Sequence, residues 1–433
     1  MSQPETICVL GLWHLGCVVS ACWAELGHRV IGLDRSREVV GGLRTGRTPI
    51  FEPGLDALIQ TNVSAGRLEF RTEFPDALRA SDFVFVAFDT PVDADDRLDL
   101  APLHAAIRNA ASCLKRDAIV IVSSQVPVGT CARWREEIRA LSGHPAVDVA
   151  CSPENLRLGE AIRCYLHPDR IVLGTDVEAT RQRVVDLFGA MGAPILSMRL
   201  SSAEMAKHAL NGFLATSVSF INEIATLCEA TSADVLAVTE ALKSDPRIGP
   251  FASIAPGLGF AGGTLARDVQ ALKQIGRARG ADTPLLDAVL EVNRRRPGLV
   301  VQRLGVLYGT MHGLMVGVLG LTYKAGTSTL RRSVALEVIG SLASAGATVR
   351  AYDPRADLSE LDGPMAFEPV PTPYDAAVGA SALVILTEWP EFRRLDFDRI
   401  KSVMAKPVIV DGKNLLADLD LEQEGFVYLG IGR

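Results

Sequence analysis

A glycine-rich turn followed by an acidic residue is the first feature of this sequence that could do chemistry. Gly11 and Gly16 enclose four residues directly after an apolar run, as in the GxGxxG turn that holds the pyrophosphate of a dinucleotide. Trp13 stands where the second glycine of that pattern normally lets the backbone approach the phosphates. Asp34 ends a second apolar run, where a carboxylate binds an adenosine ribose and favours NAD over NADP. Despite Trp13, and despite Arg35 beside the acid, the pattern predicts NAD binding.

A second group of reactive side chains lies near the middle of the chain. Lys207 and Asn211 are four residues apart in a segment with helical periodicity, so their side chains share one helix face. Asp268 follows Thr264 by four residues, near a predicted helix start. Such a set of cation, amide and carboxylate can support removal of a hydroxyl proton while a hydride leaves to NAD. This chemistry does not need a thiol.

Alternating strands and helices must position these residues. Buried strands are expected at the apolar runs 6–10, 30–34, 83–87, 118–122 and 170–174. Helical periodicity predicts a long central helix over 202–230, and then helices over 268–279 and 284–296. The α/β pattern restarts with strands at 315–321, 347–354, 382–386 and 407–411. The predicted fold class is α/β, with two Rossmann-like, doubly wound parallel-sheet domains joined by a long central helix.

Composition narrows the range of partners. The chain has 433 residues, 48% hydrophobic and 22% charged, which is ordinary for a globular protein of about two to four domains. A net charge of −7 argues against a general nucleic-acid binder. The sequence has no signal-peptide pattern and no apolar run long enough to span a membrane, so a cytoplasmic protein is expected. The eight cysteines form no CxxC pair, which predicts reduced thiols and no metal site.

Several segments resemble, in one order along nearly the whole chain, the UDP-glucose/GDP-mannose dehydrogenase family. They are residues 43–55, 89–91, 127–130, 152–157, 167–172, 203–211, 221–224, 245–249, 256–260 and 320–324, together with Arg331. The resemblance implies NAD-dependent oxidation of the primary alcohol of a nucleotide-linked hexose, and a homodimer. It also implies an NAD-binding domain over 1–198 and a central dimerisation and active-site region over 199–300. A nucleotide-sugar-binding domain is implied over 301–433.

The resemblance also assigns roles to single residues. Lys207 and Asp268 would order a water and stabilise alkoxide charge, and Asn211 would position the oxyanion. The implied catalytic residues are Lys207, Asn211, Asp268, Glu154 and Thr264. The implied cofactor-binding residues are Gly11, Trp13, His14, Leu15, Gly16, Asp34, Arg35, Thr90, Pro91, Gln125 and Arg331. The implied substrate-binding residues are Asn155, Leu156, Arg157, Lys207, Asn211, Arg247, Phe260, Gly262, Tyr323 and Lys324.

The chain departs from the family pattern at the nucleophile. The family forms a thioester on a cysteine in a GFGGxCxxKD loop, whereas this chain has Thr264 there and Arg267 in place of the loop lysine. A threonine hydroxyl is a poor nucleophile without an adjacent base, which disfavours the thioester route. Gln125 replaces a catalytic threonine and Leu158 replaces an acid. Cys164, which replaces an aspartate, is expected to be a small buried apolar residue rather than a displaced nucleophile.

Three functions stay open on this evidence. The favoured one is an NAD-dependent oxidoreductase that acts on a nucleotide or nucleotide-sugar alcohol by one hydride transfer, giving a carbonyl product. The second is a redox-neutral, epimerase-type enzyme that oxidises and then re-reduces its substrate on bound NAD. The third is a catalytically degenerate homologue that binds a nucleotide sugar without turning it over.

Overall fold

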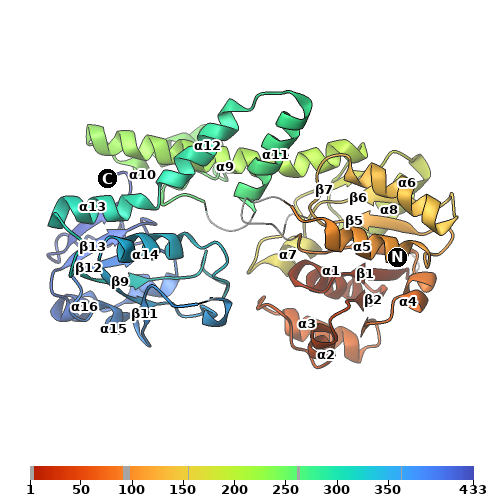
Figure 1. Ribbon diagram of the computed structural model, residues 1–433, viewed down its shortest axis with the longest axis horizontal. Helices are drawn as coiled ribbons and strands as arrows, with labels where there is room; N and C mark the ends of the chain where they lie inside the picture. Colours follow the sequence, from red (N-terminus) through yellow and green to blue (C-terminus); the bar gives the residue numbers. More distant parts are fainter. Residues whose placement is uncertain (1–3, 91–97, 155, 261–263, 362) are drawn as a thin grey trace. The chain divides into compact units, whose positions relative to one another are not determined.

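A computed structural model describes residues 4–90, 98–154, 156–260, 264–361 and 363–433 of the chain. The chain divides into two compact units, Met1–Ala209 and Leu210–Arg433. Helix α9 (Leu200–Thr231), 32 residues long, begins in the first unit and continues into the second (Figure 1). The prediction of a long central helix is therefore confirmed.

The first unit is built on an eight-stranded sheet in the order β3-β2-β1-β4-β5-β6-β7-β8. The strands are β1 (Thr6–Leu10), β2 (Arg29–Leu33), β3 (Leu68–Arg71), β4 (Phe83–Val86), β5 (Ile119–Val122), β6 (Asp148–Cys151), β7 (Ile171–Gly174) and β8 (Ile195–Met198). Neighbouring strands pair in parallel, apart from an antiparallel junction between β6 and β7. The predicted doubly wound parallel sheet is confirmed with this one exception.

Helices cover both faces of this sheet. They are α1 (His14–Glu25), α2 (Arg37–Arg44), α3 (Leu55–Ser64), α4 (Pro75–Ala80), α5 (Ala101–Ala111), α6 (Thr130–Ser142), α7 (Ala161–Leu166), α8 (Glu178–Phe188) and the 3-10 helix η1 (Gly189–Met191). Phe83 and Phe85 of β4 pack on the face that carries α1, α3 and α8, whereas Val84 and Val86 pack against α4, α5 and α6. Because both faces of the strand are buried, its sequence is apolar throughout.

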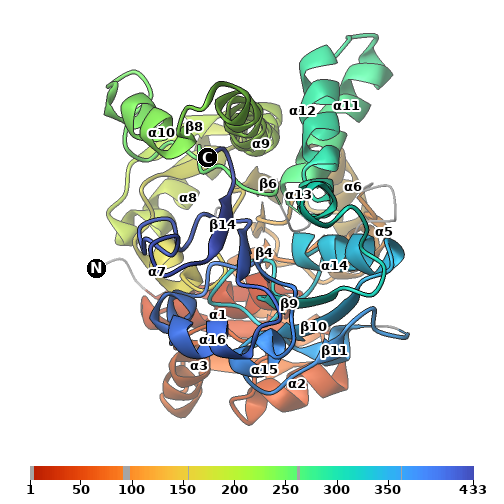
Figure 2. The same ribbon diagram turned by 90° about the vertical axis from the view of Figure 1, so that its left-hand side faces the viewer.

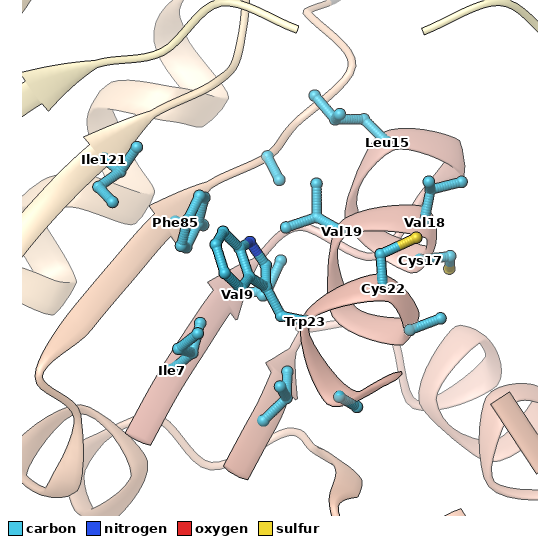
Figure 3. Packing of buried hydrophobic residues seen from close by; sticks show 14 of the residues in the cluster. Ile7, Val9, Leu15, Cys17, Val18, Val19, Cys22, Trp23, Phe85 and Ile121 are labelled. Carbon is cyan, nitrogen blue, oxygen red and sulfur yellow. The ribbon is translucent and has the colours of Figure 1, made fainter. Parts of the chain in front are cut away.

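Helix α1 contributes the largest side chain of the first core. Trp23 extends from α1 towards Phe85 of β4, and their ring centroids are 5.6 Å apart (Figure 3). The ring of Phe188, from α8, lies edge-on to the same indole at 5.2 Å. This packing fixes α1 against the sheet, and so fixes the turn from which α1 begins.

The second unit repeats the order of the first six strands in a six-stranded, fully parallel sheet, β11-β10-β9-β12-β13-β14. Strands β9, β10, β11 and β14 of this sheet are labelled in Figure 2. Its strands are β9 (Met315–Leu319), β10 (Thr348–Tyr352), β11 (Glu368–Pro369), β12 (Ala382–Ile385), β13 (Val408–Asp411) and β14 (Val427–Gly430). Helices α13 (Gly298–Tyr308) and α14 (Val334–Ser344) cover one face, and α15 (Pro373–Ala377) and α16 (Phe397–Val403) the other. The remaining helices are α10 (Val235–Ser244), α11 (Leu265–Arg279), α12 (Pro284–Arg295), η2 (Leu358–Glu360) and η3 (Pro390–Arg394).

The two sheets place candidate site residues where ligands bind in this kind of fold. In an open α/β sheet, ligands bind outside the carboxyl ends of the strands, where the strand order reverses. That point lies between β1 and β4 in the first unit and between β9 and β12 in the second. In the described part of the chain, none of the helices has the length and apolar character required to cross a bilayer.

Candidate active site

The turn between β1 and α1 needs both of its glycines. Gly11 has a φ of +89°, and a Cβ atom there would lie 2.7 Å from the ring of Phe88. A Cβ atom on Gly16 would lie 1.7 Å from the carbonyl oxygen of Gly11, so no other residue allows α1 to start so close to the strand. Trp13 has an ordinary extended φ of −91° and its side chain is 46% exposed. The turn therefore accepts a tryptophan without strain.

Asp34 keeps the capacity to bind a further donor. One carboxylate oxygen accepts a hydrogen bond from the backbone N–H of Leu12 and the other from that of Ser36, both at 2.9 Å. A carboxylate offers about four acceptor positions, so two remain for ribose hydroxyls. The glycine turn, the start of α1 and Asp34 together fit a dinucleotide. Arg35 is exposed beside Asp34.

The corresponding acid of the second sheet has no such capacity. Asp353 follows β10, and one of its oxygens accepts bonds from the backbone N–H groups of Leu321 and Thr322, the Thr322 hydroxyl and the Trp389 indole. Its other oxygen accepts two further backbone N–H groups. With its acceptor positions filled by the protein, Asp353 fixes the turn after β9 rather than binding a ribose.

The start of α1 carries two acidic neighbours that the sequence does not reveal. The Asp89 carboxylate accepts the backbone N–H of Leu15 at 3.3 Å, at the helix end where a pyrophosphate is expected. His14 is buried, with its Nε2 2.9 Å from a carboxylate oxygen of Glu52. Leu15 itself is buried in the core below the turn.

Residues after β4 and β5 are joined by a buried bond. The Thr90 hydroxyl donates to the carbonyl oxygen of Gln125 at 2.8 Å, and both residues are buried. The side-chain amide of Gln125 lies 3.5 Å from Nδ1 of His208, a fully buried residue of α9. Pro91 lies outside the described residues. His208 was not singled out from the sequence, because Gln125 precedes it by 83 positions.

Lys207 is held against the end of β6 rather than in solvent. Its side chain is 9% exposed, and its ammonium donates to the carbonyl oxygen of Glu154 at 2.6 Å. The Glu154 carboxylate lies 3.8 Å from the same ammonium and accepts the backbone N–H of Leu156 at 2.5 Å. Arg157 is exposed, and Asn155 lies outside the described residues.

Another α9 residue fixes the turn that follows β5. The Glu204 carboxylate is buried and accepts the backbone N–H groups of Gly129 and Cys131 at 2.6 and 2.7 Å. It thereby caps the first turn of α6, which has no side-chain cap of its own. The role of Glu204 was missed because the residues it contacts are more than seventy positions earlier.

In the second unit, Asn211 and Asp268 meet directly. The Asn211 amide donates to the Asp268 carboxylate, and both side chains are buried. Asp268 lies in the first turn of α11, and Thr264 is the exposed residue that precedes this helix. The Thr264 side chain forms no capping hydrogen bond. Gly262 lies outside the described residues.

The segment that leads to Thr264 is held by residues that the sequence did not single out. Asn293 accepts from the backbone N–H of Phe260 at 2.7 Å and donates to its carbonyl oxygen at 3.3 Å. The buried Arg296 guanidinium donates twice to the carbonyl oxygen of Gly257, at 2.8 and 3.0 Å. Burial lowers the pKa of Arg296 to about 10. The Phe260 side chain packs among apolar residues, so any substrate contact of this residue comes from its backbone.

Four candidate substrate or cofactor residues of the second unit lie in exposed or half-buried loops. Arg247 is exposed and forms an ion pair with Asp245 at 2.6 Å. The Lys324 ammonium lies 5.9 Å from the centre of the Tyr323 ring, in the turn that follows β9. Arg331 is exposed shortly before α14.

The cysteines of the chain offer no replacement for the missing thiol in the second unit. Cys228 is the only cysteine after position 209, and it is buried in the C-terminal core. It follows Asn211 by seventeen residues on α9, which corresponds to about 25 Å along a helix. Burial also raises the pKa of Cys8 and Cys22 in the first unit. Cys164 is half-buried, so the expectation of a buried apolar residue there is wrong.

Three features of the structure indicate the kind of enzyme to which this chain is related. A dinucleotide-type turn on one Rossmann-like sheet, a second such sheet and a buried lysine on a long helix are typical of two-domain NAD-dependent oxidoreductases. The chain belongs to the UDP-glucose/GDP-mannose dehydrogenase family. The family's NAD binding domain matches residues 5–191, its central domain residues 201–295 and its UDP binding domain residues 317–418. NAD is therefore the cofactor.

Individual relatives are similar over almost their whole length. UDP-glucose 6-dehydrogenase TuaD of Bacillus subtilis (strain 168) is 36% identical over 99% of this chain and 93% of its own. A UDP-glucose 6-dehydrogenase of Rhizobium meliloti (strain 1021) is 38% identical over 99% of both chains. The solved structure of a UDP-glucose dehydrogenase from Pyrobaculum islandicum superposes with a TM-score of 0.92 at 34% identity, covering 100% of this chain and 98% of that one.

Proposed function

We propose that this protein uses NAD to oxidise an alcohol of a nucleotide sugar and releases a carbonyl product after one hydride transfer. The observation that carries the proposal is the pairing of a retained Asn211–Asp268 contact with a threonine at the position of the family's nucleophile. Without a thiol to trap the aldehyde, the second oxidation of the family has no covalent intermediate. UDP-glucose is the first substrate to test, because the relatives described above are UDP-glucose dehydrogenases.

Each catalytic residue has a separate role in the single hydride-transfer step. Bound NAD supplies the acceptor for the hydride that leaves the carbinol carbon. Asp268, through an ordered water, takes the proton of the substrate hydroxyl, and its bond to Asn211 orients its carboxylate. Lys207 stabilises the negative charge that develops on the substrate oxygen. Its burial supports this role, because a charge acts more strongly where water is excluded.

The test is to count NADH formed for each UDP-glucose consumed by the purified protein, with the product identified by mass spectrometry. One NADH for each sugar, with an aldehyde or its hydrate as product, is the expected result. Two NADH and a carboxylate would overturn the single-step proposal. Conversion to an isomer without NADH would favour the redox-neutral reaction. Binding without conversion across a panel of nucleotide sugars would favour a degenerate binding protein.

We also propose that the protein is a homodimer. Helix α9 exposes Phe213, Phe220 and Leu227, with 70%, 50% and 56% of their side chains accessible. Because they are spaced by seven residues, they form one apolar stripe along the helix. A stripe of large exposed apolar residues is typical of a surface that a partner covers.

A further inference from the structure

One buried carboxylate in the first unit contacts two segments. In the proposed function, one of them binds the cofactor and the other binds the substrate. Glu52, which precedes α3, is only 3% exposed. One of its oxygens lies 2.9 Å from Nε2 of His14 and also accepts the backbone N–H of Gly159 at 2.9 Å. Its other oxygen accepts the backbone N–H of Ala161 at 2.8 Å. A single side chain thus contacts residues 38, 107 and 109 positions away.

The two ends of this contact belong to the cofactor turn and to the substrate segment. His14 is the first residue of α1 and lies inside the turn that begins at Gly11. Gly159 and Ala161 lie at the start of α7, a few residues after Glu154, whose backbone holds Lys207. The Glu52 side chain therefore links the N-terminal end of α1 to the start of α7.

Glu52 also caps the N-terminal end of α7, which a residue adjacent to the helix normally does. The residue before α7 is Glu160, and its side chain does not cap the helix. Burial acts to raise the pKa of Glu52, but hydrogen bonds from His14, Gly159 and Ala161 outweigh it and leave that pKa lowered. The carboxylate is therefore ionised, and its negative charge stabilises the N-terminal end of α7.

Helices α1 and α7 are also joined directly further along. The Trp23 indole of α1 donates to the Tyr165 hydroxyl of α7 at 2.8 Å. In Figure 1 the two helices lie next to each other in the first unit, in agreement with this contact. Glu52 at one end and the Trp23–Tyr165 bond at the other therefore join α7 to α1 at two points.

We propose that Glu52 is a positioning residue that couples NAD binding at the Gly11–Gly16 turn to the placement of the substrate segment 154–161. This inference rests on the proposed function, because that segment is taken to contact the nucleotide sugar. Glu52 touches neither the cofactor nor the substrate in this scheme. Its contacts instead link the conformation of the cofactor turn to that of the substrate segment.

The first test is hydrogen exchange of the peptide that covers residues 156–166, measured with and without saturating NAD. In the native protein, NAD is expected to increase protection of the amides of Gly159 and Ala161. Glu52→Gln is expected to remove this response, because a carboxamide has one acceptor oxygen and cannot accept all three bonds. Glu160→Gln, which neutralises an exposed carboxylate next to the same amides, is the matched control and keeps the response.

A second variant separates coupling from helix capping. His14→Phe leaves the bonds from Glu52 to α7 in place but removes the link to the turn. At saturating NAD its α7 amides should be as protected as in the native protein without NAD, with no further increase. This variant also keeps the proposal testable if Glu52→Gln fails to fold. An NAD-dependent increase that survives both substitutions would overturn the proposal.

The third measurement is the effect of NAD on the dissociation constant of UDP-glucose, measured by calorimetry. If the sites are coupled, NAD should tighten UDP-glucose binding by about fivefold or more in the native protein and in Glu160→Gln. In Glu52→Gln the two dissociation constants should agree within about twofold. Unchanged coupling in Glu52→Gln would contradict the inference. The exchange experiment needs no turnover, so absence of NADH formation would overturn the proposed function without affecting this test.

Discussion

At position 264 a threonine carries the proposal that oxidation stops after one hydride transfer. Thr264 directly precedes α11, and Asp268 follows within the first turn of that helix. A threonine hydroxyl ionises far less readily than a thiol, so it attacks a carbonyl only with an adjacent base. A serine or threonine at this point does not supply the chemistry of a thioester.

Replacing Thr264 by cysteine should restore the second oxidation. We expect Thr264→Cys to raise the yield from one to two NADH per UDP-glucose and to change the product to a carboxylate, because a thiolate can form the covalent intermediate. Thr264→Ser is the control and should keep a ratio of one. The ratio is measured from NADH absorbance and the sugar consumed. Equal ratios in the native protein and Thr264→Cys would contradict this assignment.

The proposed role of Lys207 depends on its burial. A lysine on a long helix is normally solvated, but this one is buried with its ammonium on the Glu154 carbonyl oxygen. Desolvation of a charge costs free energy, and the carbonyl oxygen and carboxylate of Glu154, at 2.6 and 3.8 Å, offset part of that cost. We take the remaining cost as the sign of a functional charge.

The variant Lys207→Met should lose activity far beyond any loss of stability. A drop in kcat/KM of about 10²- to 10⁴-fold is expected, since removal of a group that stabilises the developing alkoxide acts on the transition state. Lys273→Met is the matched control, because Lys273 is also largely buried and forms an ion pair with Asp287 at 2.6 Å. Thermal unfolding and steady-state kinetics are compared for both. Similar activity losses in the two variants would remove Lys207 from the proposed mechanism.

Among the elements, α1 begins beside a carboxylate. The N-terminal end of a helix attracts anions, and the first turn of α1 is where a pyrophosphate is expected. Here the Asp89 carboxylate already accepts the Leu15 N–H, so it competes with the cofactor for the same donor. The helix therefore offers a weaker anion site than its glycine turn suggests.

Removal of this charge should strengthen cofactor binding. We expect Asp89→Asn to lower the dissociation constant of NAD by about two- to tenfold, with a smaller difference at high ionic strength. Asp76→Asn, which changes an exposed acid paired with Arg79, is the control and should have little effect. Calorimetric titrations at two salt concentrations give the dissociation constant of NAD and its dependence on ionic strength. Weaker NAD binding in Asp89→Asn would mean that the carboxylate orders the turn more than it repels the phosphates.

A second element, α12, holds the segment 257–260, which precedes Thr264 in the chain. Asn293 bonds both backbone groups of Phe260, and Arg296 holds the carbonyl oxygen of Gly257. Gly259 between them has a φ of +97°, and a Cβ atom there would lie 2.4 Å from the Asn293 side chain. Helix α12 and its end thus act as a rigid support for a glycine-rich segment.

For the whole molecule, the exposed apolar stripe on α9 bears on how many chains assemble. The exposed side chains of Phe213, Phe220 and Leu227 lie along the part of α9 that belongs to the second unit. Large apolar side chains that remain exposed on a regular helix favour association, because covering them removes apolar area from water.

The double variant Phe213→Glu/Phe220→Glu should convert a dimer into a monomer. Two charges in an apolar interface would remain desolvated and unpaired, which costs several kcal/mol by order of magnitude. Phe251→Glu is the control, since Phe251 is 97% exposed but does not lie on α9. Light scattering after gel filtration reports the mass of each variant. A dimer that survives the double substitution would mean that another surface mediates assembly.

Much of the fold was predictable because its signals are local. The Gly11–Gly16 turn, the apolar runs and the 3.6-residue periodicity of α9 each depend on residues close in sequence, and the expected central helix ends within two residues of the observed one. The strands β3, β6, β8, β11 and β14 were missed. Among them, β3, β6 and β8 contain charged or polar residues, so they lack the uninterrupted apolar run that indicated β4 and β5.

The family, the cofactor turn with Asp34 and the threonine at position 264 could all be identified from the amino-acid sequence. The structure was needed to find which distant side chains are held together: Glu52 with His14 and α7, Glu204 with the start of α6, and Asn293 with Phe260. These contacts join residues 33 to 109 positions apart. Their formation depends on the register of the sheet and the packing of helices upon it, which no local pattern of residues specifies.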